Sequence, residues 1–253
     1  NDNYQVTSNF VCGNFTGGEG AGIAHFGLSD GGVIADNTVL FNENFNQGLT
    51  VNGGGILISG QPPQGCPAGD LACLDDPNRS LSEGSGSVSI VRNLIKGNAA
   101  GAGDGGGIRT SRVNGQDTRR GRNTAPQRLW NRIEIVNNMI TNNVAALSGA
   151  GISLHDTLRA TIVNNTIANN DNASVASEAF EPGNPSVSIA QPGAGIVSRT
   201  HSFELNHFLP ATEDAFSNPV LSDNIVWQNR MFNWMVAPDG SFSGLCPDLG
   251  GLG

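Results

Sequence analysis

Two neighbouring residues, His155 and Asp156, carry side chains that can exchange a proton. An imidazole beside a carboxylate can act in general acid–base catalysis when a second acid or base lies within reach. Arg109 and Arg199 are candidates to complete a mixed cluster, because a guanidinium pairs well with a substrate carboxylate or phosphate. His155, Asp156 and Arg199 are therefore the catalytic candidates, provided that the fold brings them together.

Arginine is concentrated in residues 109–132, which hold seven arginines and one acid, Asp117. This segment is a candidate site for an anionic glycan or another anionic partner. The alternative is that it folds onto its own acidic chain and forms internal ion pairs. No aromatic residue is interleaved with the arginines of 109–128, and the whole chain carries a net charge of −9, so nucleic-acid binding is not expected. The binding candidates are Arg112, Arg119, Arg120, Arg122 and Arg128.

Metal binding is the third chemistry to consider. Glu204 lies between His201 and His207, and imidazoles and carboxylates are ligands of transition metals. The alternative is that these loop histidines are simply solvated. Calcium would need oxygen ligands from surface acids, although none of these acids forms a recognisable calcium loop. The calcium candidates are Asp70, Asp75, Asp76 and Asp104. No other cofactor is expected.

The four cysteines help to predict the cellular compartment of the protein. Cys66 and Cys73 bracket six residues, a loop that a disulfide can close, and a disulfide favours an oxidising, extracytoplasmic location. Two free thiols, or half of a metal site, are the alternatives. The sequence does not decide whether Cys12 and Cys246 pair. The chain starts without Met and ends in a glycine-rich stretch, so we interpret residues 1–253 as one domain excised from a longer precursor.

A repeated phrase predicts the elements that would position these residues. An aliphatic residue, Asn, a second aliphatic residue and a second Asn recur at fixed positions in six copies. The shortest spacings between copies are 27 and 28 residues, which give the length of one coil. The first asparagines of the copies are Asn9, Asn37, Asn93, Asn138, Asn165 and Asn224. The longer spacings contain insertions, at residues 59–87, 109–132, 171–192 and 197–219.

This pattern predicts short strands that turn at asparagine corners. Asn tolerates the left-handed backbone region, and stacked Asn side chains can bond one another as a ladder. A second phrase, Gly-x-Gly-Ile, follows five of the six copies, and its glycines allow a sharp turn into the next strand. One such coil cannot bury its own apolar face, so the coils must stack. We therefore predict an all-β fold, a right-handed parallel β-helix solenoid of about six coils.

The repeat also carries a family resemblance. The Ile-x-x-Asn-x-Ile-x-x-Asn phrase, read at Ile162 to Asn170, resembles the parallel β-helix repeat of pectate-lyase-like folds. Together with Gly53-Gly54-Gly55-Ile56 it also resembles repeats of polymorphic outer-membrane proteins. The resemblance implies the architecture over residues 4–230, and it implies a strand face near His155 as the place for catalytic groups. The resemblance says little about function, because this fold occurs in lyases, hydrolases, epimerases, adhesins and stalks. The motifs typical of polygalacturonases and mannuronan epimerases are missing.

These features favour a non-catalytic, extracytoplasmic module, a structural or adhesive segment of a bacterial surface or secreted protein with glycan or protein partners. No apolar run approaches the ~18 residues of a membrane-spanning helix. One alternative is a polysaccharide lyase or glycoside hydrolase that acts on an acidic glycan. Another is a subunit of a larger extracellular assembly, with aromatic residues near the C-terminal end either capping the last coil or forming a docking face. Those aromatic residues are Trp227, Phe232 and Trp234.

Overall fold

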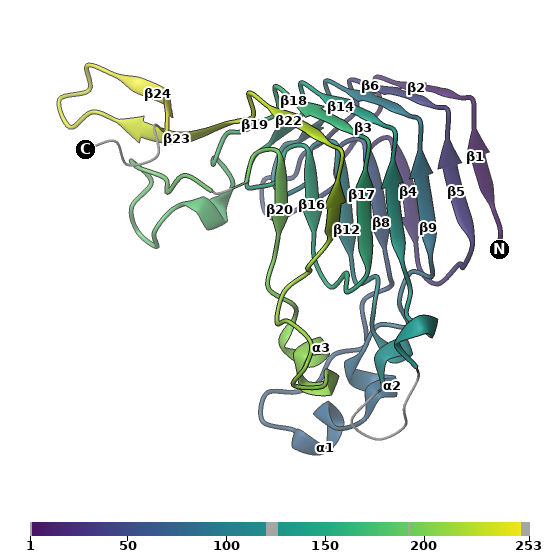
Figure 1. The fold of residues 1–253 in the computed structure, drawn as a ribbon. Helices are drawn as coiled ribbons and strands as arrows, with labels where there is room; N and C mark the ends of the chain where they lie inside the picture. The colour runs from purple at the N-terminus through teal and green to yellow at the C-terminus, as the bar shows by residue number, and fades with distance from the viewer. Residues whose placement is uncertain (1, 120–125, 192, 249–253) are drawn as a thin grey trace.

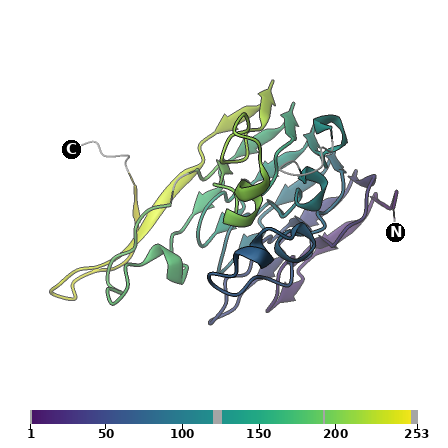
Figure 2. The ribbon, with the colours of Figure 1, turned by 90° about the horizontal axis from the view of Figure 1, so that it is seen from below.

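The computed structural model describes residues 2–119, 126–191 and 193–248. Short parallel strands form four sheets, and the chain visits each sheet in turn before it returns to the first (Figure 1). We call one such circuit of four strands a coil. The strands β1 (Gln5–Thr7) and β22 (Ile225–Trp227) lie at opposite ends of the stack of coils (Figures 1 and 2).

The strands of the four sheets are as follows. Sheet A contains β1 (Gln5–Thr7), β5 (Gly32–Ala35), β9 (Val88–Val91), β13 (Ile133–Val136), β17 (Ala160–Val163) and β21 (Val220–Ser222). Sheet B contains β2 (Phe10–Cys12), β6 (Thr38–Leu40), β10 (Leu94–Lys96), β14 (Met139–Thr141), β18 (Thr166–Ala168) and β22 (Ile225–Trp227). Sheet C contains β3 (Phe15–Thr16), β7 (Glu43–Asn44), β11 (Ala99–Ala100), β15 (Val144–Ala145), β19 (Asp171–Asn172), β23 (Arg230–Val236) and β24 (Ser243–Pro247). Sheet D contains β4 (Ile23–Phe26), β8 (Ile56–Ser59), β12 (Ile108–Ser111), β16 (Ile152–Leu154) and β20 (Ile196–Ser198).

This arrangement confirms the predicted all-β fold with stacked parallel strands, and it is compatible with a β-helix. Each predicted insertion begins inside a strand: residue 59 belongs to β8, residues 109–111 to β12, residues 171–172 to β19 and residues 197–198 to β20. The hairpin of β23 and β24 is antiparallel and projects away from the stack (Figures 1 and 2).

Aliphatic side chains of the repeat fill the interior. Ile34, Ile90, Ile135 and Ile162 occupy equivalent positions in sheet A, and all four are fully buried. Parallel columns come from sheets B and D, so every coil in the middle of the stack buries its apolar face against two neighbours. A single coil has no such neighbour, which is why the core exists only in the stack.

Two ladders of asparagines run along the stack, as predicted. In the ladder that begins at Asn9, each side-chain amide donates to the Oδ1 of the next asparagine over 3.0 Å. The same Oδ1 also accepts from the backbone N–H of the preceding ladder residue. The second ladder has the same pattern and consists of Asn14, Asn42, Asn98, Asn143, Asn170 and Asn229.

The prediction that the ladder asparagines themselves take the left-handed conformation was wrong. Positive φ falls on the residue before each of them, for example Asp36 at 59° before Asn37 and Arg92 at 55° before Asn93. The preceding residue makes the corner, and this leaves the asparagine free to direct its side chain along the stack. The turn therefore tolerates several residue types, whereas the ladder position requires an amide.

The insertions carry the helices. Those after β8, β12 and β20 lie together at one side of the stack, whereas the one after β19 lies beside the β23–β24 hairpin (Figure 1). Leu81 packs with Leu205 and Phe208, which joins the insertion after β8 to the one after β20. The helices are α1 (Leu71–Leu74), α2 (Pro77–Ser80) and α3 (Phe203–Phe208), and the short 3-10 helices are η1 (Gln116–Thr118), η2 (Gln127–Leu129) and η3 (Ser177–Ala179). No helix in the described part of the chain is long and apolar enough to cross a bilayer.

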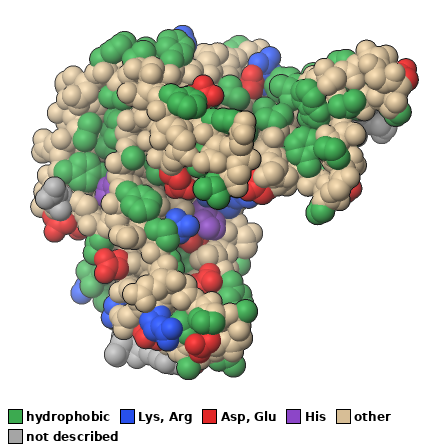
Figure 3. All heavy atoms as spheres, turned by 180° about the vertical axis from the view of Figure 1, so that it is seen from behind, with side chains coloured by type: hydrophobic (Ala, Val, Ile, Leu, Met, Phe, Trp, Pro, Cys, Tyr) green, Lys and Arg blue, Asp and Glu red, His purple; other side chains and the backbone are tan. Residues whose placement is uncertain are grey.

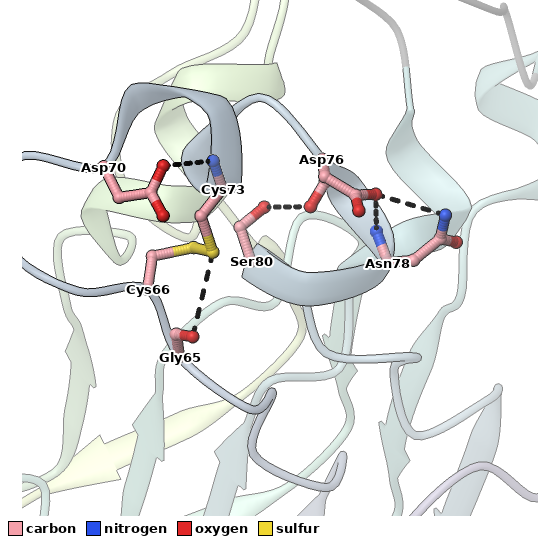
Figure 4. Close-up of a disulfide and its surroundings, with 7 residues drawn as sticks. All are labelled: Gly65, Cys66, Asp70, Cys73, Asp76, Asn78 and Ser80. Atoms are coloured by element: carbon pink, nitrogen blue, oxygen red, sulfur yellow. Dashed lines mark hydrogen bonds between the residues drawn. A yellow bond between two sulfur atoms is a disulfide. The ribbon is translucent and has the colours of Figure 1, made fainter.

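The predicted disulfide between Cys66 and Cys73 is confirmed (Figure 4). It joins the start of the loop to α1, where Asp70 caps the helix by accepting from the Cys73 N–H at 2.9 Å. Cys12 and Cys246 are free thiols.

Replacing Cys66 with serine is expected to loosen this loop without unfolding the sheets. The disulfide closes a ring of only eight residues, which stabilises the loop by about 2 kcal/mol through chain entropy. Hydrogen exchange at residues 66–80 should become up to about thirtyfold faster, since each 1.4 kcal/mol is about tenfold, while exchange in β9 and β13 stays unchanged. Equal acceleration in the sheets would contradict a purely local role.

Candidate functional site

A polar cluster lies where sheet D meets the turns and insertions beside it. Ile108 and Thr110 of β12 point into the core, so the alternation of the strand places Arg109 on the outer face of sheet D. Arg109 is in register with Ser153 of β16. We define the polar cluster by its members: Asp104, Arg109, Ser148, Ser153, His155, Asp156, Arg199 and His201.

Stacking places His155 beside Arg199. His155 follows β16 and its N–H donates to the Thr110 carbonyl, while Arg199 follows β20 and donates to the Leu154 carbonyl. The two residues thus occupy equivalent positions on neighbouring coils. Both side chains are partly exposed, 27% for His155 and 34% for Arg199. Figure 3 shows a histidine with basic and acidic neighbours in a hollow between the coils, the insertions and the projecting arm.

Asp104 connects the two arginines. Its carboxylate accepts from Nη1 of Arg199 at 2.9 Å and forms an ion pair with Nη1 of Arg109 at 3.1 Å. Ser148 donates to it through both its hydroxyl, at 2.6 Å, and its backbone N–H, at 3.0 Å. Burial lowers the pKa of Arg109, and the charge of Asp104 opposes that shift. Asp104 therefore holds one buried and one accessible guanidinium in place.

Asp156 connects the two histidines. Its Oδ1 lies 3.8 Å from Nε2 of His155 and 3.6 Å from Nδ1 of His201, and it accepts from the N–H of Ser202 at 2.7 Å. Burial acts to raise the pKa of Asp156, but His201, His155 and Ser202 together keep it below its usual value. The carboxylate is therefore ionised at neutral pH.

His155 is the accessible imidazole of the cluster. Burial lowers its pKa; Asp156 opposes the shift, and Arg109, Arg199 and His201 add to it. The ring is therefore neutral at pH 7, and a ring nitrogen can accept a proton or a hydrogen bond. His201 is fully buried, and neither of its ring nitrogens has a hydrogen-bond partner among the described residues.

The structure brings together the candidates His155, Asp156 and Arg199, together with Arg109. It does not unite the metal candidates His201, Glu204 and His207. His207 instead pairs with Asp75 at 2.9 Å, and within the described ranges no three His, Cys, Asp or Glu side chains are arranged to hold a metal ion.

The calcium candidates are engaged in other contacts. Asp70 and Asp76 cap α1 and α2, and Asp75 pairs with His207 (Figure 4). The expectation that Asp104 is a surface acid was wrong, because it is buried beneath two arginines.

The arginine-rich segment is described only in part. Arg109, its first residue, belongs to the polar cluster. Arg119 donates to the side chains of Asn78 and Gln116 rather than to an acid. Arg112 is half-buried and Arg128 is exposed. Arg120 and Arg122 lie outside the described residues.

Sequence reasoning missed Asp104 as the partner of both arginines and missed the two serines. One signal was available: Asp104 and Ser148 both stand directly before the first glycine of a Gly-x-Gly-Ile phrase, so stacked coils must place them side by side.

The chain matches no known protein family, no curated protein and no solved structure. The assignment of function therefore depends on this geometry.

Proposed function

We propose that this protein is a right-handed parallel β-helix module of an extracytoplasmic protein, and that the outer face of sheet D binds an anionic glycan without cleaving it. The stacked sheets supply a rigid support for such a face. The Cys66–Cys73 disulfide is of the kind that persists in oxidising compartments, which supports the location.

One observation carries the proposal: Arg199 is both accessible and fixed. Its Nη1 is held by Asp104 at 2.9 Å and Ser148 at 2.7 Å, while a third of the side chain reaches solvent. A guanidinium fixed in this way pays little entropy when a uronate carboxylate or a sulfate pairs with its remaining N–H groups. The adjacent neutral His155 supplies a hydrogen-bond partner for a sugar hydroxyl.

The buried carboxylates favour binding over hydrolysis. A glycoside hydrolase needs two carboxyl groups that reach the scissile bond. Here Asp104 is occupied by two arginines and a serine, and Asp156 by Ser202 and two histidines. Both are nearly inaccessible to a ligand.

A lyase is the second candidate, and the pairing of His155 with Arg199 favours it. In a β-elimination, neutral His155 would take the proton from the carbon next to a uronate carboxylate, and Arg199 would stabilise the charge that develops there. The glycosidic C–O bond on the next carbon would break, a C=C bond would form, and the leaving oxygen would take up a proton.

The Arg199→Gln variant tests the binding site. We expect its affinity for polygalacturonate to fall about tenfold or more, because a charge-assisted hydrogen bond contributes roughly 1.5–3 kcal/mol. Titration calorimetry against polygalacturonate and a neutral glucan measures the effect. Arg92→Gln is the matched control, since it removes the same charge from an exposed arginine that pairs with Asp36 outside the polar cluster.

Unchanged affinity in Arg199→Gln, or equal loss in Arg92→Gln, would refute the site. Ultraviolet absorbance of unsaturated products, abolished in His155→Gln, would replace the binding module with the lyase.

A further inference from the structure

The charges of the polar cluster balance at neutral pH. Both arginines, Arg109 and Arg199, pair with Asp104, at 3.1 Å and 2.9 Å. The second carboxylate, that of Asp156, has no arginine within ion-pair distance among the described residues and lies between the two histidines instead. Because two positive and two negative charges cancel, one proton added to an imidazole would give the cluster a net positive charge.

His155 is the imidazole that can take up this proton from solvent. Its side chain is partly exposed, and its Nε2 lies 3.8 Å from Oδ1 of Asp156. The side chain of His201, by contrast, is fully buried. A proton on Nε2 of His155 would therefore face a carboxylate that no arginine neutralises. Histidine is also the side chain that ordinarily changes its charge between about pH 5 and pH 8.

The charged and titratable groups that face His155 come from three elements. Arg109 of β12, and Arg199 and His201 of the insertion after β20, oppose its protonation, whereas Asp156 in its own turn favours it. Burial and the positive groups hold the pKa of His155 below its usual value, so the imidazole gains charge only in acid. The pKa of Asp156 is also below its usual value, so that carboxylate stays ionised in mild acid.

Arg199, the proposed glycan contact, occupies the position on the next coil that is equivalent to that of His155. A protonated imidazole would thus lie beside the accessible guanidinium. We propose that the polar cluster is a pH-dependent binding site, in which protonation of His155 in mild acid strengthens the binding of an anionic glycan. This inference rests on the proposed function and gives His155 a second role, as an ionic partner for a glycan carboxylate or sulfate.

The lyase alternative has the opposite dependence on pH. A β-elimination requires the neutral imidazole of His155 as the base, so acid would slow the cleavage of a polyuronate. The direction of the pH effect therefore separates the two functions.

Calorimetric titration with polygalacturonate tests the proposal. We expect the affinity of the wild-type protein to rise about tenfold between about pH 7.5 and about pH 5, because a hydrogen bond from a charged donor is roughly twice as strong as one from a neutral donor. Protonation of the glycan itself would weaken binding over the same interval, so a rise must come from the protein.

Two variants assign the rise to one residue. His155→Gln should lose it, whereas His207→Gln, the matched control, should keep it, because His207 pairs with Asp75 in the insertions, outside the polar cluster. The chain as a whole also becomes less negative in acid, and both variants share that change. A difference between them therefore reports on His155 alone.

Proton uptake by the wild-type protein is a second measurement and needs no variant. Because the coupling between proton and glycan is reciprocal, glycan binding must raise the proton affinity of His155 by the same factor. Titrations near pH 6, the ordinary range of histidine, in two buffers of different ionisation enthalpy should therefore show net uptake of up to about one proton per site.

The possible failures are distinguishable. Absence of binding to polygalacturonate at both pH values would refute the proposed function, and this inference with it. Affinity that does not rise in acid, binding without proton uptake, or a rise that His155→Gln retains would overturn the pH dependence and leave the binding site standing. Circular dichroism at both pH values checks folding, and if His155→Gln does not fold, proton uptake by the wild-type protein decides.

Discussion

Gly107→Ala is expected to lower the free energy of unfolding by about 3 kcal/mol, the upper range for overpacking a close contact. A Cβ at this position would lie 2.6 Å from the carbonyl oxygen of Gly151 on the next coil and 2.8 Å from Cγ2 of Ile140. The Gly151 oxygen also accepts from Ile108 N–H at 2.9 Å, so moving it away would weaken the sheet. The backbones of neighbouring coils approach too closely here for any side chain.

Gly195→Ala is the matched control, because Gly195 holds the equivalent position at the open end. A Cβ there meets only side-chain atoms, the nearest being Nδ2 of Asn229 at 2.9 Å. Urea denaturation of both variants gives the comparison, with Gly195→Ala close to wild type. Equal destabilisation would show that the glycine is required for its backbone conformation rather than for the approach of the next coil.

Asp104→Ala is expected to cost about 3–5 kcal/mol of stability, the usual penalty for removing one partner of a buried ion pair. Arg109 would keep a buried positive charge with Asp104 gone, and Ser148 would lose its acceptor. The same change should weaken glycan binding, since Arg199 would lose the carboxylate that fixes it.

Two comparisons identify the cause of this loss. Asp36→Ala removes the acid from the exposed Arg92–Asp36 pair, where solvent already screens both charges, and should change stability little. Asp104→Ala combined with Arg109→Met removes the stranded charge and should recover much of the lost stability. Failure of the double variant to recover would mean that packing around Asp104, rather than its charge, is what matters. Thermal melts of the three variants decide between them.

The repeating part of the fold could be predicted from the sequence because each coil packs on its neighbours through the same kinds of residue. The aliphatic columns and the asparagine ladders recur at fixed spacing, so a match at six copies located the strands of sheets A and B. The left-handed corners were assigned one residue too late, because the visible asparagine reflects the ladder and not the turn.

The insertions obey no such repeat, and their structure was not predicted. Their short helices depend on local capping, as when the Ser202 hydroxyl accepts from Leu205 N–H at the start of α3. The pairing of Asp104 with Arg199 joins residues 95 positions apart. The register of sheet D, rather than the length of the insertions between these two residues, brings them together. The sequence pattern of a single coil does not reveal that register.

The stacking of coils also determines how the molecule would respond to mechanical load. Tension applied from one end of the stack to the other passes through every interface between coils in series. At each interface the backbone bonds of the four sheets and the bonds of the two asparagine ladders share the load at the same moment. Rupture would therefore begin at the single weakest interface. Additional coils would make the stack longer but would not raise the force at which it ruptures.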